Sequence, residues 1–419
     1  MDDLKSFSTE LAGQDTTFLG DVQYVYHCHH FNLFHDQTVE DALGEEQAFK
    51  VRCLAAADAV RPLLAGLVQG AGANSATERL ALAGRLFPWM GHGRLEFQTN
   101  AQGGQARGEF LHYSFSWREK YGAKISRRHP IDAFAAGYVA AATEVAFDLA
   151  PGSMASNETS CYVLREPSCQ FDLQAKSVAP QPPPAIGRAA VENHVAAPMS
   201  GEGEDEIQKI ASGLKDYLIG VAGDDRGLVQ GFGLYVTRHL AAYYNATAFD
   251  TIHYIEQNNP ATTPVVEELF GESGHVCAFY TCGNILMSPE WEAMVGPVRG
   301  ETEEIVHACV AICRALGFGH WTVRELVPGQ RLVMRSSSNY EAPFYLERYG
   351  RAAKPRSYFF ANAARAIMQL AHRVDWPSRP NLNDDLYQSL FRTGLGWNME
   401  QTACLTKGDE YCEVVVSKA

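Results

Sequence analysis

The sequence predicts an α+β protein built from two tandem, similar domains, each with helices packed on an antiparallel sheet. Segments with helical periodicity alternate with short strand-like segments, which favours a mixed fold. Three residue patterns also recur in the same order in both halves, which is typical of an internal duplication. With 419 residues, of which 46% are hydrophobic and 20% charged, the chain is long enough for two packed domains.

The recurring patterns define the predicted domain boundaries. In each pair the residue types and their spacing match: Tyr26 and Cys28 with Tyr280 and Cys282; Glu119, Tyr121 and Gly122 with Glu347, Tyr349 and Gly350; and Cys161 and Cys169 with Cys404 and Cys412. We therefore predict domains at 1–173 and 206–419 that pack as an intramolecular pseudo-dimer. Between them, 174–205 is rich in proline and glycine, as expected of an extended, solvated linker.

Each predicted element follows from the local periodicity of hydrophobic residues and from the residues that end helices and strands. In the first half the spacing predicts a long amphipathic helix over 38–69, a strand-like start to 111–122, a helix over 129–149 and a hairpin over 161–173. In the second half it predicts a helical lead-in over 206–244, a helix over 301–316 and a hairpin over 317–341.

Charge and composition exclude several classes of partner. The formal net charge is -14 and no Lys/Arg-rich run occurs, so we expect no nucleic-acid or anionic-membrane binding. No apolar run reaches the roughly 18–20 residues of a membrane helix, and the first residues lack a secretory signal pattern. The expected location is cytoplasmic, where the ten cysteines are reduced thiols.

The segment 24–36 (YVYHCHHFNLFHD) concentrates chemically active side chains. It holds four of the 14 histidines and one cysteine, which indicates a site rather than packing alone. In one hypothesis Cys28 is a nucleophile and His30, or one of His27 and His29, is its base. In the other, some of these groups bind a transition metal with help from His112 or His129. For any single histidine, a core or hydrogen-bonded role is the simpler interpretation.

Aromatic residues near this segment could form an apolar pocket. We predict that Tyr24, Tyr26, Tyr113 and Trp117 contact a substrate and that Arg118 and Glu119 anchor its polar groups. The alternative is that the aromatic side chains belong to the core and that Arg118 and Glu119 form a solvated surface pair.

The end of the chain carries a recognisable pattern. Cys404, Gly408, Asp409 and Cys412, in a strand-turn-strand setting, resemble the C-terminal signature of the 4-vinyl-reductase, or hydrocarbon-binding, domain family. The resemblance implies a compact α/β domain that often pairs, so a homodimer is a further expectation. It also implies small hydrophobic ligands.

Some members of that family, the ligand domains of phenol-type sensors, hold zinc beside an aromatic-ligand pocket through Glu-x2-Cys-x7-Cys and one upstream cysteine. The resemblance therefore implies Glu158, Cys161 and Cys169 as zinc ligands. The upstream cysteine is missing, and His129 is the nearest substitute. The second half has Gln401 where the glutamate would align. The alternative in both halves is a pair of buried, reduced cysteines.

Two functions follow from these observations. The first is a cytoplasmic small-molecule enzyme that binds an apolar or aromatic substrate and acts through Cys28 and its histidines, by hydrolytic or metal-assisted chemistry. The alternative is a non-catalytic binding or sensor protein for a small hydrocarbon or aromatic molecule. No P-loop, GxGxxG, GxSxG or HExxH motif occurs in a fitting context, so the motifs do not decide between them.

Overall fold

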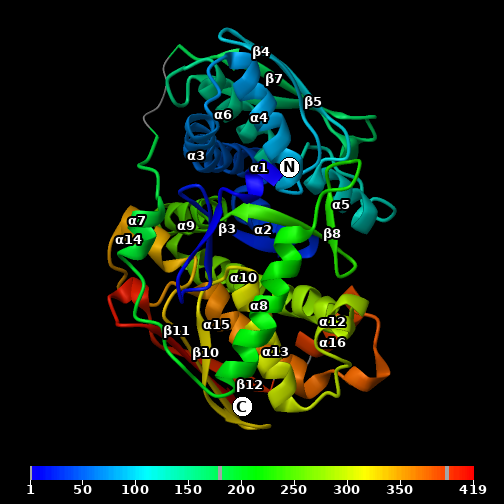
Figure 1. Ribbon diagram of the computed structural model, residues 1–419, viewed down its shortest axis with the longest axis vertical. Coiled ribbons are helices and arrows are strands. Elements are labelled where there is room, and N and C mark those ends of the chain that lie inside the picture. The colour runs from blue at the N-terminus through cyan, green and yellow to red at the C-terminus, as the bar shows by residue number, and fades with distance from the viewer. Residues whose placement is uncertain (1, 178–181, 392–395) are drawn as a thin grey trace.

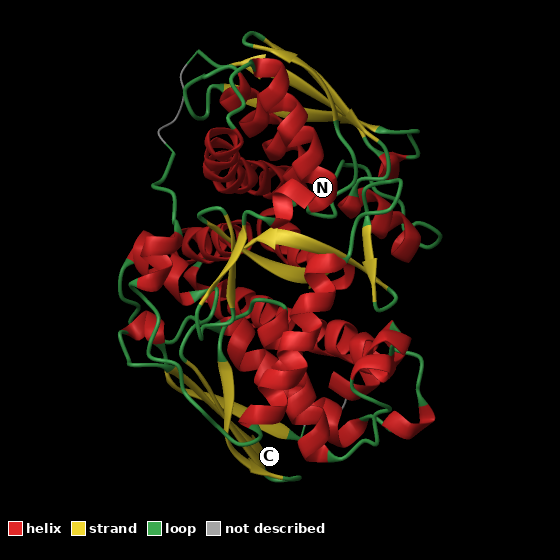
Figure 2. Cartoon of the chain, viewed as in Figure 1, coloured by secondary structure: helices red, strands yellow, loops and turns green. Residues whose placement is uncertain are grey.

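The computed structural model describes residues 2–177, 182–391 and 396–419 and confirms the α+β class. Three antiparallel sheets occur in this part of the chain. Two four-stranded sheets lie at opposite ends of the molecule, and a five-stranded sheet crosses its middle (Figure 1). Helices fill the space between the central sheet and each end sheet (Figure 2). No helix among the described residues is both long enough and apolar enough to span a membrane.

The N-terminal half (residues 2–175) begins in the central sheet and ends in the upper one. Its elements are α1 (Asp2–Lys5), β1 (Ser8–Leu11), β2 (Thr16–Leu19), β3 (Val22–Cys28), α2 (His29–Leu43), α3 (Glu45–Ala71), α4 (Ala76–Trp89), β4 (Glu96–Asn100), β5 (Gly103–Gly108), α5 (His112–Tyr121), α6 (Ala133–Ala146), β6 (Met154–Ser160), the 3₁₀ turn η1 (Tyr162–Leu164) and β7 (Cys169–Ala175).

The C-terminal half (residues 204–418) repeats much of this order. After a short connecting helix α7 (Arg188–Glu192), its elements are α8 (Glu204–Gly220), β8 (Val229–Gly231), β9 (Leu234–Leu240), α9 (Ala241–Asn258), α10 (Thr263–Val276), the π-helix η3 (Cys277–Cys282), α11 (Gly283–Met287), α12 (Pro289–Met294), α13 (Thr302–Ala315), β10 (Trp321–Val327), β11 (Arg331–Ser336), α14 (Ala342–Tyr349), α15 (Tyr358–Arg373), α16 (Asp384–Phe391), β12 (Trp397–Ala403) and β13 (Cys412–Lys418), with 3₁₀ turns at Pro260–Thr262, Trp376–Ser378 and Leu405–Lys407.

The two halves share the same architecture. The end sheets have matching strand orders, β4-β5-β7-β6 and β10-β11-β13-β12. In each half a hairpin strand leads into a long helix, β3 into α2 and β9 into α9. The last two strands of each half are joined through a 3₁₀ turn, between Cys161 and Cys169 in one and Cys404 and Cys412 in the other. The repeated order therefore extends over both halves, as the cysteine spacing predicts.

The central sheet joins the halves. Its strand order is β1-β2-β3-β9-β8, so β3 of one half pairs with β9 of the other. The pairing is antiparallel, with Tyr24 opposite Leu240 and Cys28 opposite Val236. All seven residues of β3 are buried. This shared sheet is the contact of the intramolecular pseudo-dimer.

One of the three recurring sequence patterns does not match equivalent elements of the two halves. Tyr280 and Cys282 lie in the π-helix η3, whereas Tyr26 and Cys28 lie in β3. The true counterpart of β3 is β9, which lies inside the predicted helical lead-in 206–244. A two-residue match occurs by chance, and the short alternating segment around Val236 gives a weak signal beside the longer helices α8 and α9.

Several element boundaries also differ from expectation. The predicted helix 38–69 is two helices, α2 and α3, separated at Gly44, whose φ of 78° is outside the helical range. The segment that starts at Leu111 is helical in α5 and not strand-like. The helix predicted over 129–149 begins at Ala133, after Pro130, because a residue that precedes proline is driven out of the helical conformation.

The predicted linker packs against both halves. Arg188 donates its backbone N–H to Asp21, and Gln14 donates to the carbonyl of Ala196. The N–H of Ala196 in turn bonds to the carbonyl of Ser337. Residues 178–181 of this segment lie outside the described residues. Where it is described, the segment contacts both halves and is not simply an extended spacer.

A buried charge network ties the first hairpin to the second half. The Asp15 carboxylate lies 2.7 Å from Nδ1 of His320 and 2.6 Å from Nζ of Lys215, and Arg314 lies 3.7 Å away. Burial alone would raise the pKa of Asp15, but these neighbours lower it below its usual value of 3.8. The ionised carboxylate is therefore part of the junction between the halves.

We expect Asp15→Asn to lower the free energy of unfolding by about 3 kcal/mol near neutral pH, because removing one partner leaves buried charges uncompensated. The stability that Asp15 contributes is present above its unfolded pKa of 3.8 and is lost as the pH falls through the lower folded pKa. The difference in unfolding free energy between Asp15→Asn and the wild type should therefore become smaller as the pH is lowered. Chemical denaturation at neutral and acidic pH measures it, with the exposed Asp225→Asn as control. Equal effects of the two changes would contradict this account.

Candidate functional site

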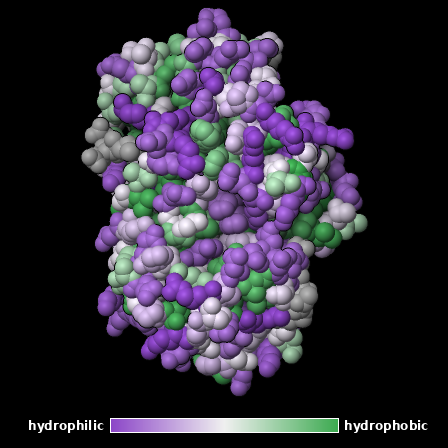
Figure 3. Space-filling view, turned by 90° about the vertical axis from the view of Figure 1, so that its right-hand side faces the viewer, coloured by the Kyte–Doolittle hydropathy of each residue, from purple (hydrophilic) through white to green (hydrophobic). Residues whose placement is uncertain are grey.

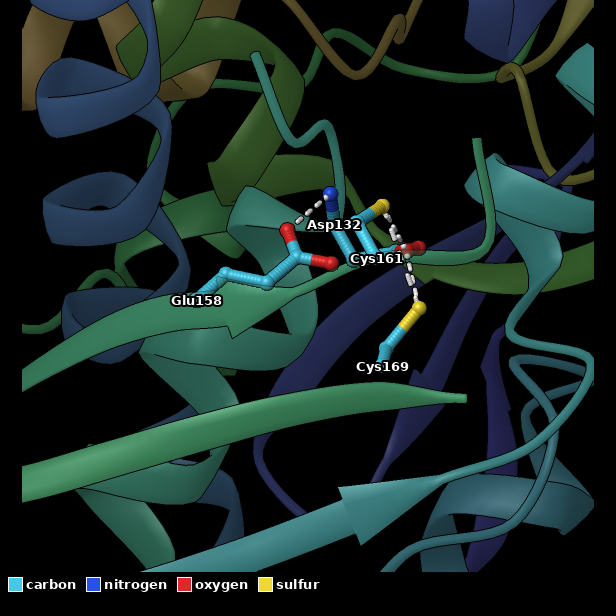
Figure 4. A group of neighbouring side chains, drawn as sticks. All are labelled: Asp132, Glu158, Cys161 and Cys169. Carbon is cyan, nitrogen blue, oxygen red and sulfur yellow. Dashed lines mark hydrogen bonds between the residues drawn. The ribbon is translucent and has the colours of Figure 1, made fainter. Parts of the chain in front are cut away.

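Four ionisable side chains meet where the last hairpin of the N-terminal half approaches helix α6. Asp132 lies at the start of α6, Glu158 lies on β6, and Cys161 and Cys169 flank the 3₁₀ turn between β6 and β7. One ligand atom from each lies within 4.8 Å of the others. Figure 4 shows their functional groups directed toward a common region. We call this group the acid–thiol cluster.

Hydrogen bonds hold the cluster together. Cys169 Sγ and Cys161 Sγ lie 3.2 Å and 3.6 Å from the same oxygen, Oδ2 of Asp132. The backbone N–H of Asp132 donates to Oε2 of Glu158 at 2.9 Å, while Oε1 of Glu158 is buried without a partner. The two sulfur atoms are 3.9 Å apart. The arrangement is convergent, yet it leaves one buried oxygen unsatisfied.

The electrostatics of the cluster are compatible with a bound cation. Burial, with Asp132 and Cys161 nearby, raises the pKa of Glu158 well above its usual value. Burial also raises the pKa of Asp132, and a hydrogen bond with Cys161 and burial raise that of Cys169. A divalent metal would remove these penalties by charge and would use the orphaned oxygen of Glu158. Two thiolates and two carboxylates form a donor set that suits zinc.

The fourth member of the cluster is Asp132, and sequence reasoning missed it. The predicted His129 is exposed and lies 3.6 Å from Glu45, away from the cluster. Asp132 lies three residues further on, and its aspartate does not match the expected cysteine. Glu158, Cys161 and Cys169 do come together. A metal at this place would be held by Asp132, Glu158, Cys161 and Cys169.

The C-terminal half keeps the thiols but not the acids. Cys404 and Cys412 lie 3.8 Å apart around the equivalent turn. Ser357, at the start of α15, takes the place of Asp132, and its hydroxyl lies 3.4 Å from Cys404 Sγ. Gln401 takes the place of Glu158 on β12. Since two charged ligands are replaced by neutral groups, this half lacks the donor set of a divalent ion.

A cavity of about 450 Å³ lies beside the acid–thiol cluster, between α2, α3 and α5. Tyr113 and Trp117 of α5 form part of its wall, as do Asp36 of α2 and Arg52 of α3. The remaining lining is mixed: the apolar or aromatic Leu33, Phe34, Tyr121, Ile125 and Ile131, and the polar Gln37, Glu40, Glu45, Ser126 and Arg127. Its size is in the range of small-molecule sites.

The charged groups of this cavity neutralise one another. Arg52 donates to Asp36 at 2.5 Å and to Glu40 at 2.7 Å. Arg127 reaches both oxygens of Glu40, at 2.8 and 2.9 Å. The hydroxyl of Tyr243, from the other half, donates to the second oxygen of Asp36. Burial raises the pKa of Asp36 to about 6, although Arg52 opposes the shift.

The cluster and the cavity share two short segments of chain. Asp132 accepts the backbone N–H of Ser114 at 3.2 Å, and Ser114 follows the cavity residue Tyr113. On the other side, Ile131 lines the cavity directly before Asp132. An ion bound by Asp132 would therefore fix the positions of two cavity walls.

A second group of buried polar side chains comes from both halves; sequence reasoning singled out His112 but missed His92 and His239. His92, His112 and His239 are fully buried, and burial lowers the pKa of each well below its usual value. Neither ring nitrogen of His92 has a partner. His239 Nε2 lies 3.0 Å from the hydroxyl of Tyr113, which also lines the cavity. The three histidines are scattered in sequence, so no spacing pattern could have revealed that they come together.

The structure gives the histidine and cysteine residues of segment 24–36 partners other than one another. Cys28 is buried, its Sγ accepts a hydrogen bond from Thr281 at 3.2 Å, and burial raises its pKa. His30 stacks on Tyr280 and accepts a hydrogen bond from Lys120 at 2.9 Å. Burial lowers the pKa of His29 to about 4. His27 stacks between Phe31 and Phe318. Burial thus keeps the thiol protonated and the imidazoles neutral.

Only some of the predicted substrate residues line the cavity. Tyr113 and Trp117 line the cavity. Tyr24 and Tyr26 are core residues of β3, and the Tyr24 hydroxyl lies 2.8 Å from that of Ser8. Arg118 packs on the ring of Tyr162 and donates to its carbonyl. Glu119 is exposed on α5.

The comparisons with known proteins leave the family open. No protein-family model matches the chain, and no curated protein matches it. Among solved structures, it is similar to the phenol-responsive sensory domain of the transcription activator PoxR with phenol, with a TM-score of 0.34 and 15% sequence identity. That match covers 42% of this chain and 87% of the other. The resemblance to 4-vinyl-reductase domains therefore stays a prediction.

We expect the protein purified without chelator to contain about one zinc ion per chain and Cys161→Ser or Asp132→Asn to lose it, as measured by elemental analysis. Removing the metal with a chelator should lower the unfolding free energy by about 3 kcal/mol if the ion is near a hundredfold excess over its dissociation constant. Cys404→Ser is the matched control and should keep the metal. Retention of zinc in Cys161→Ser would place the ion elsewhere.

Proposed function

We propose that this protein binds a small, neutral aromatic molecule in the cavity of its N-terminal half and does not turn it over. The observation that carries the proposal is the difference between the halves. In the C-terminal half, the pocket beside α9 and α10 has an open volume of only about 20 Å³, and Phe31 and His35 of α2 help to close it. The same framework thus contains a cavity in one half and a filled core in the other.

The side chains explain this difference. In the C-terminal half, α9 presents Ala248 and Phe249 where α2 presents Asp36 and Gln37. The Phe249 ring packs on that of Tyr345 with centroids 5.0 Å apart, and large aromatic residues occupy the space. In the N-terminal half, Asp36 and the nearby Glu40 both pair with Arg52 along the wall of the cavity, which leaves its centre open. Such an open space, with aromatic residues on one part of its wall and paired charges on another, is a candidate for a bound ligand.

The chemistry of the cavity favours an uncharged ring. Tyr113, Trp117 and Phe34 offer aromatic surface, which packs well on another ring. The carboxylates of Asp36 and Glu40 are already bonded to Arg52 and Arg127, so a charged ligand would have to displace one of these ion pairs. A hydroxyl substituent can instead join the existing hydrogen bonds at Asp36 or Tyr113. Phenol-like molecules fit this description.

The metal has a positioning role in this proposal. Zinc at the acid–thiol cluster would hold Asp132, and through it the cavity residues Ile131 and Tyr113, in fixed positions. All four protein groups are ligands, which is typical of a structural site and not of a catalytic site with an open position. The ion would therefore stabilise the cavity without taking part in any reaction.

The environment of Cys28 argues against turnover at this residue. A thiol nucleophile needs an ionised sulfur and a basic partner. Burial raises the pKa of Cys28, its hydrogen-bond donor is Thr281, and His30 is bonded to Lys120. The hypothesis of a Cys28–His30 enzyme therefore lacks the geometry that it needs, and the binding alternative is retained.

We expect phenol and 2-naphthol to bind in calorimetric titrations and the charged analogues benzoate and benzylamine to bind at least about tenfold more weakly, or about 1.4 kcal/mol. Trp117→Ala should weaken the binding of the neutral ligands by a similar factor, because it removes an aromatic wall. Tyr345→Ala, on the corresponding helix α14, is the matched control, since it lies in the filled half and should leave the affinity unchanged.

A second control separates binding from catalysis. Cys28→Ala should bind the neutral ligands with wild-type affinity, because Cys28 does not line the cavity. Equal binding of neutral and charged ligands, or no effect of Trp117→Ala, would argue against this cavity. Conversion of a bound ligand by wild type, lost in Cys28→Ala, would restore the enzyme hypothesis.

A further inference from the structure

The hydroxyl of Tyr113, on the wall of the cavity, has a hydrogen-bond partner in the other half of the chain. Tyr113 is the second residue of α5 in the N-terminal half, and its hydroxyl oxygen lies 3.0 Å from Nε2 of His239. His239 lies on β9, the strand that pairs with β3 in the central sheet. Both side chains are buried, and Tyr113 also lines the cavity. The C-terminal half therefore supplies a polar group to the wall of a cavity that belongs to the N-terminal half.

A second contact of the same kind fixes the neighbouring wall. The hydroxyl of Tyr243, the third residue of α9, donates to Oδ1 of Asp36 at 3.2 Å. The other oxygen of Asp36, Oδ2, accepts from Arg52 at 2.5 Å. The rings of Tyr243 and His239 pack with their centroids 4.6 Å apart. Two adjacent side chains of the C-terminal half thus hold two polar groups of the cavity wall.

Burial sets the protonation states of Tyr113 and His239. It raises the pKa of the Tyr113 hydroxyl well above its usual value and lowers the pKa of His239 well below its usual value. Tyr113 therefore keeps its proton, and His239 is a neutral imidazole that can accept it in a hydrogen bond. When Tyr113 donates to Nε2 of His239, both lone pairs of its oxygen stay free to accept. Hydrogen bonds in such a chain polarise one another, so His239 makes the Tyr113 oxygen a better acceptor.

The equivalent positions of the C-terminal half hold different partners. The residue equivalent to Tyr113, six positions before the recurring Glu-x-Tyr-Gly pattern, is Glu341. Its carboxylate accepts two backbone N–H groups at the start of α15, at 3.0 and 3.3 Å. His27 precedes the last residue of β3 as His239 precedes the last residue of β9. The His27 ring stacks on a phenylalanine, and its Nε2 has no hydrogen-bond partner. The hydroxyl–histidine contact thus accompanies the open cavity and not the filled pocket.

We propose that Tyr113 and His239 form a hydroxyl-recognition pair, built from both halves, that selects aromatic ligands carrying a hydroxyl group. The ligand hydroxyl donates to the Tyr113 oxygen, and the Tyr113 hydroxyl donates to Nε2 of His239. Tyr113 contacts the ligand, whereas His239 is a positioning residue that acts through Tyr113. Asp36 is less suited to this role, because both of its oxygens already accept hydrogen bonds. This inference rests on the proposed binding function and adds the residues that determine the class of ligand.

The test compares three ligands of similar size in calorimetric titrations of the full chain. Phenol can donate and accept a hydrogen bond, anisole can only accept one, and toluene can do neither. Tyr113→Phe should lower the ratio of phenol affinity to toluene affinity about fivefold, the worth of one neutral hydrogen bond. The affinity for toluene, and the ratio of anisole affinity to toluene affinity, should stay unchanged, because the Tyr113 oxygen acts as an acceptor.

His239 is tested through the same ratio. His239→Leu should lower the phenol-to-toluene ratio by a smaller factor, and His239→Gln, which keeps an acceptor at the end of the side chain, should preserve the ratio better than His239→Leu does. The double variant Tyr113→Phe, His239→Leu should have the ratio of Tyr113→Phe alone, because His239 acts through Tyr113. If the His239 variants do not fold, Tyr113→Phe still decides whether the pair recognises a hydroxyl.

Tyr244→Phe is the matched control. The Tyr244 hydroxyl, on the same helix as Tyr243, donates to Asn32 of the N-terminal half, and Tyr244 does not line the cavity. The control therefore removes a buried hydroxyl that connects the halves, and it should leave the phenol-to-toluene ratio unchanged.

The outcomes separate this inference from the proposed function. The pair is overturned if Tyr113→Phe leaves the phenol-to-toluene ratio unchanged, if it lowers the anisole-to-toluene ratio equally, or if Tyr244→Phe lowers the phenol-to-toluene ratio as much. A folded His239→Leu variant with the wild-type ratio would remove the C-terminal half from the site. If the wild type binds none of the three ligands, the proposed function fails and the inference fails with it.

Discussion

The antiparallel pairing of β3 with β9 is the constraint on which the rest of the structure depends. It joins the two halves in one sheet and buries every residue of β3. Helices α2 and α9 follow directly from these strands, so the pairing also sets where each half places its long helices (Figure 1). The cavity wall on α2 and the Tyr243 hydroxyl that reaches Asp36 from α9 both follow from this arrangement.

On the face shown in Figure 3, hydrophobic residues occur in separate groups among hydrophilic ones.

The two halves show how few side chains separate a site from a packed core. At the start of α6 and α15, Asp132 is replaced by Ser357, and on the adjacent strand Glu158 is replaced by Gln401. The cysteines and the backbone turn between them are kept. Both halves keep the cysteines and the turn between them, whereas the two acidic members of the acid–thiol cluster occur in the N-terminal half.

The sequence was sufficient for what depends on local pattern. The hairpin with Cys161 and Cys169 could be found because its spacing recurs at Cys404 and Cys412, and long amphipathic helices have a clear period. What failed depends on distant contacts. Asp132 and His92 have no local signature, since their partners come from other elements. The β9 strand has a weak local signal, and its pairing with β3 on one side and β8 on the other makes it a strand.

Burial gives the segment 24–36 a different meaning from the one that its composition suggests. A row of histidines and a cysteine indicates acid–base chemistry when water can reach it, but a dry environment favours neutral imidazole and protonated thiol. Here burial lowers the pKa of His27 well below its usual value and raises that of Cys28. Groups in this state favour their neutral forms near neutral pH, and they can still stack and form hydrogen bonds. His27 does this between two phenylalanine rings and beside the thiol of Cys277. The same desolvation that disfavours a nucleophile therefore leaves ring surfaces suited to packing.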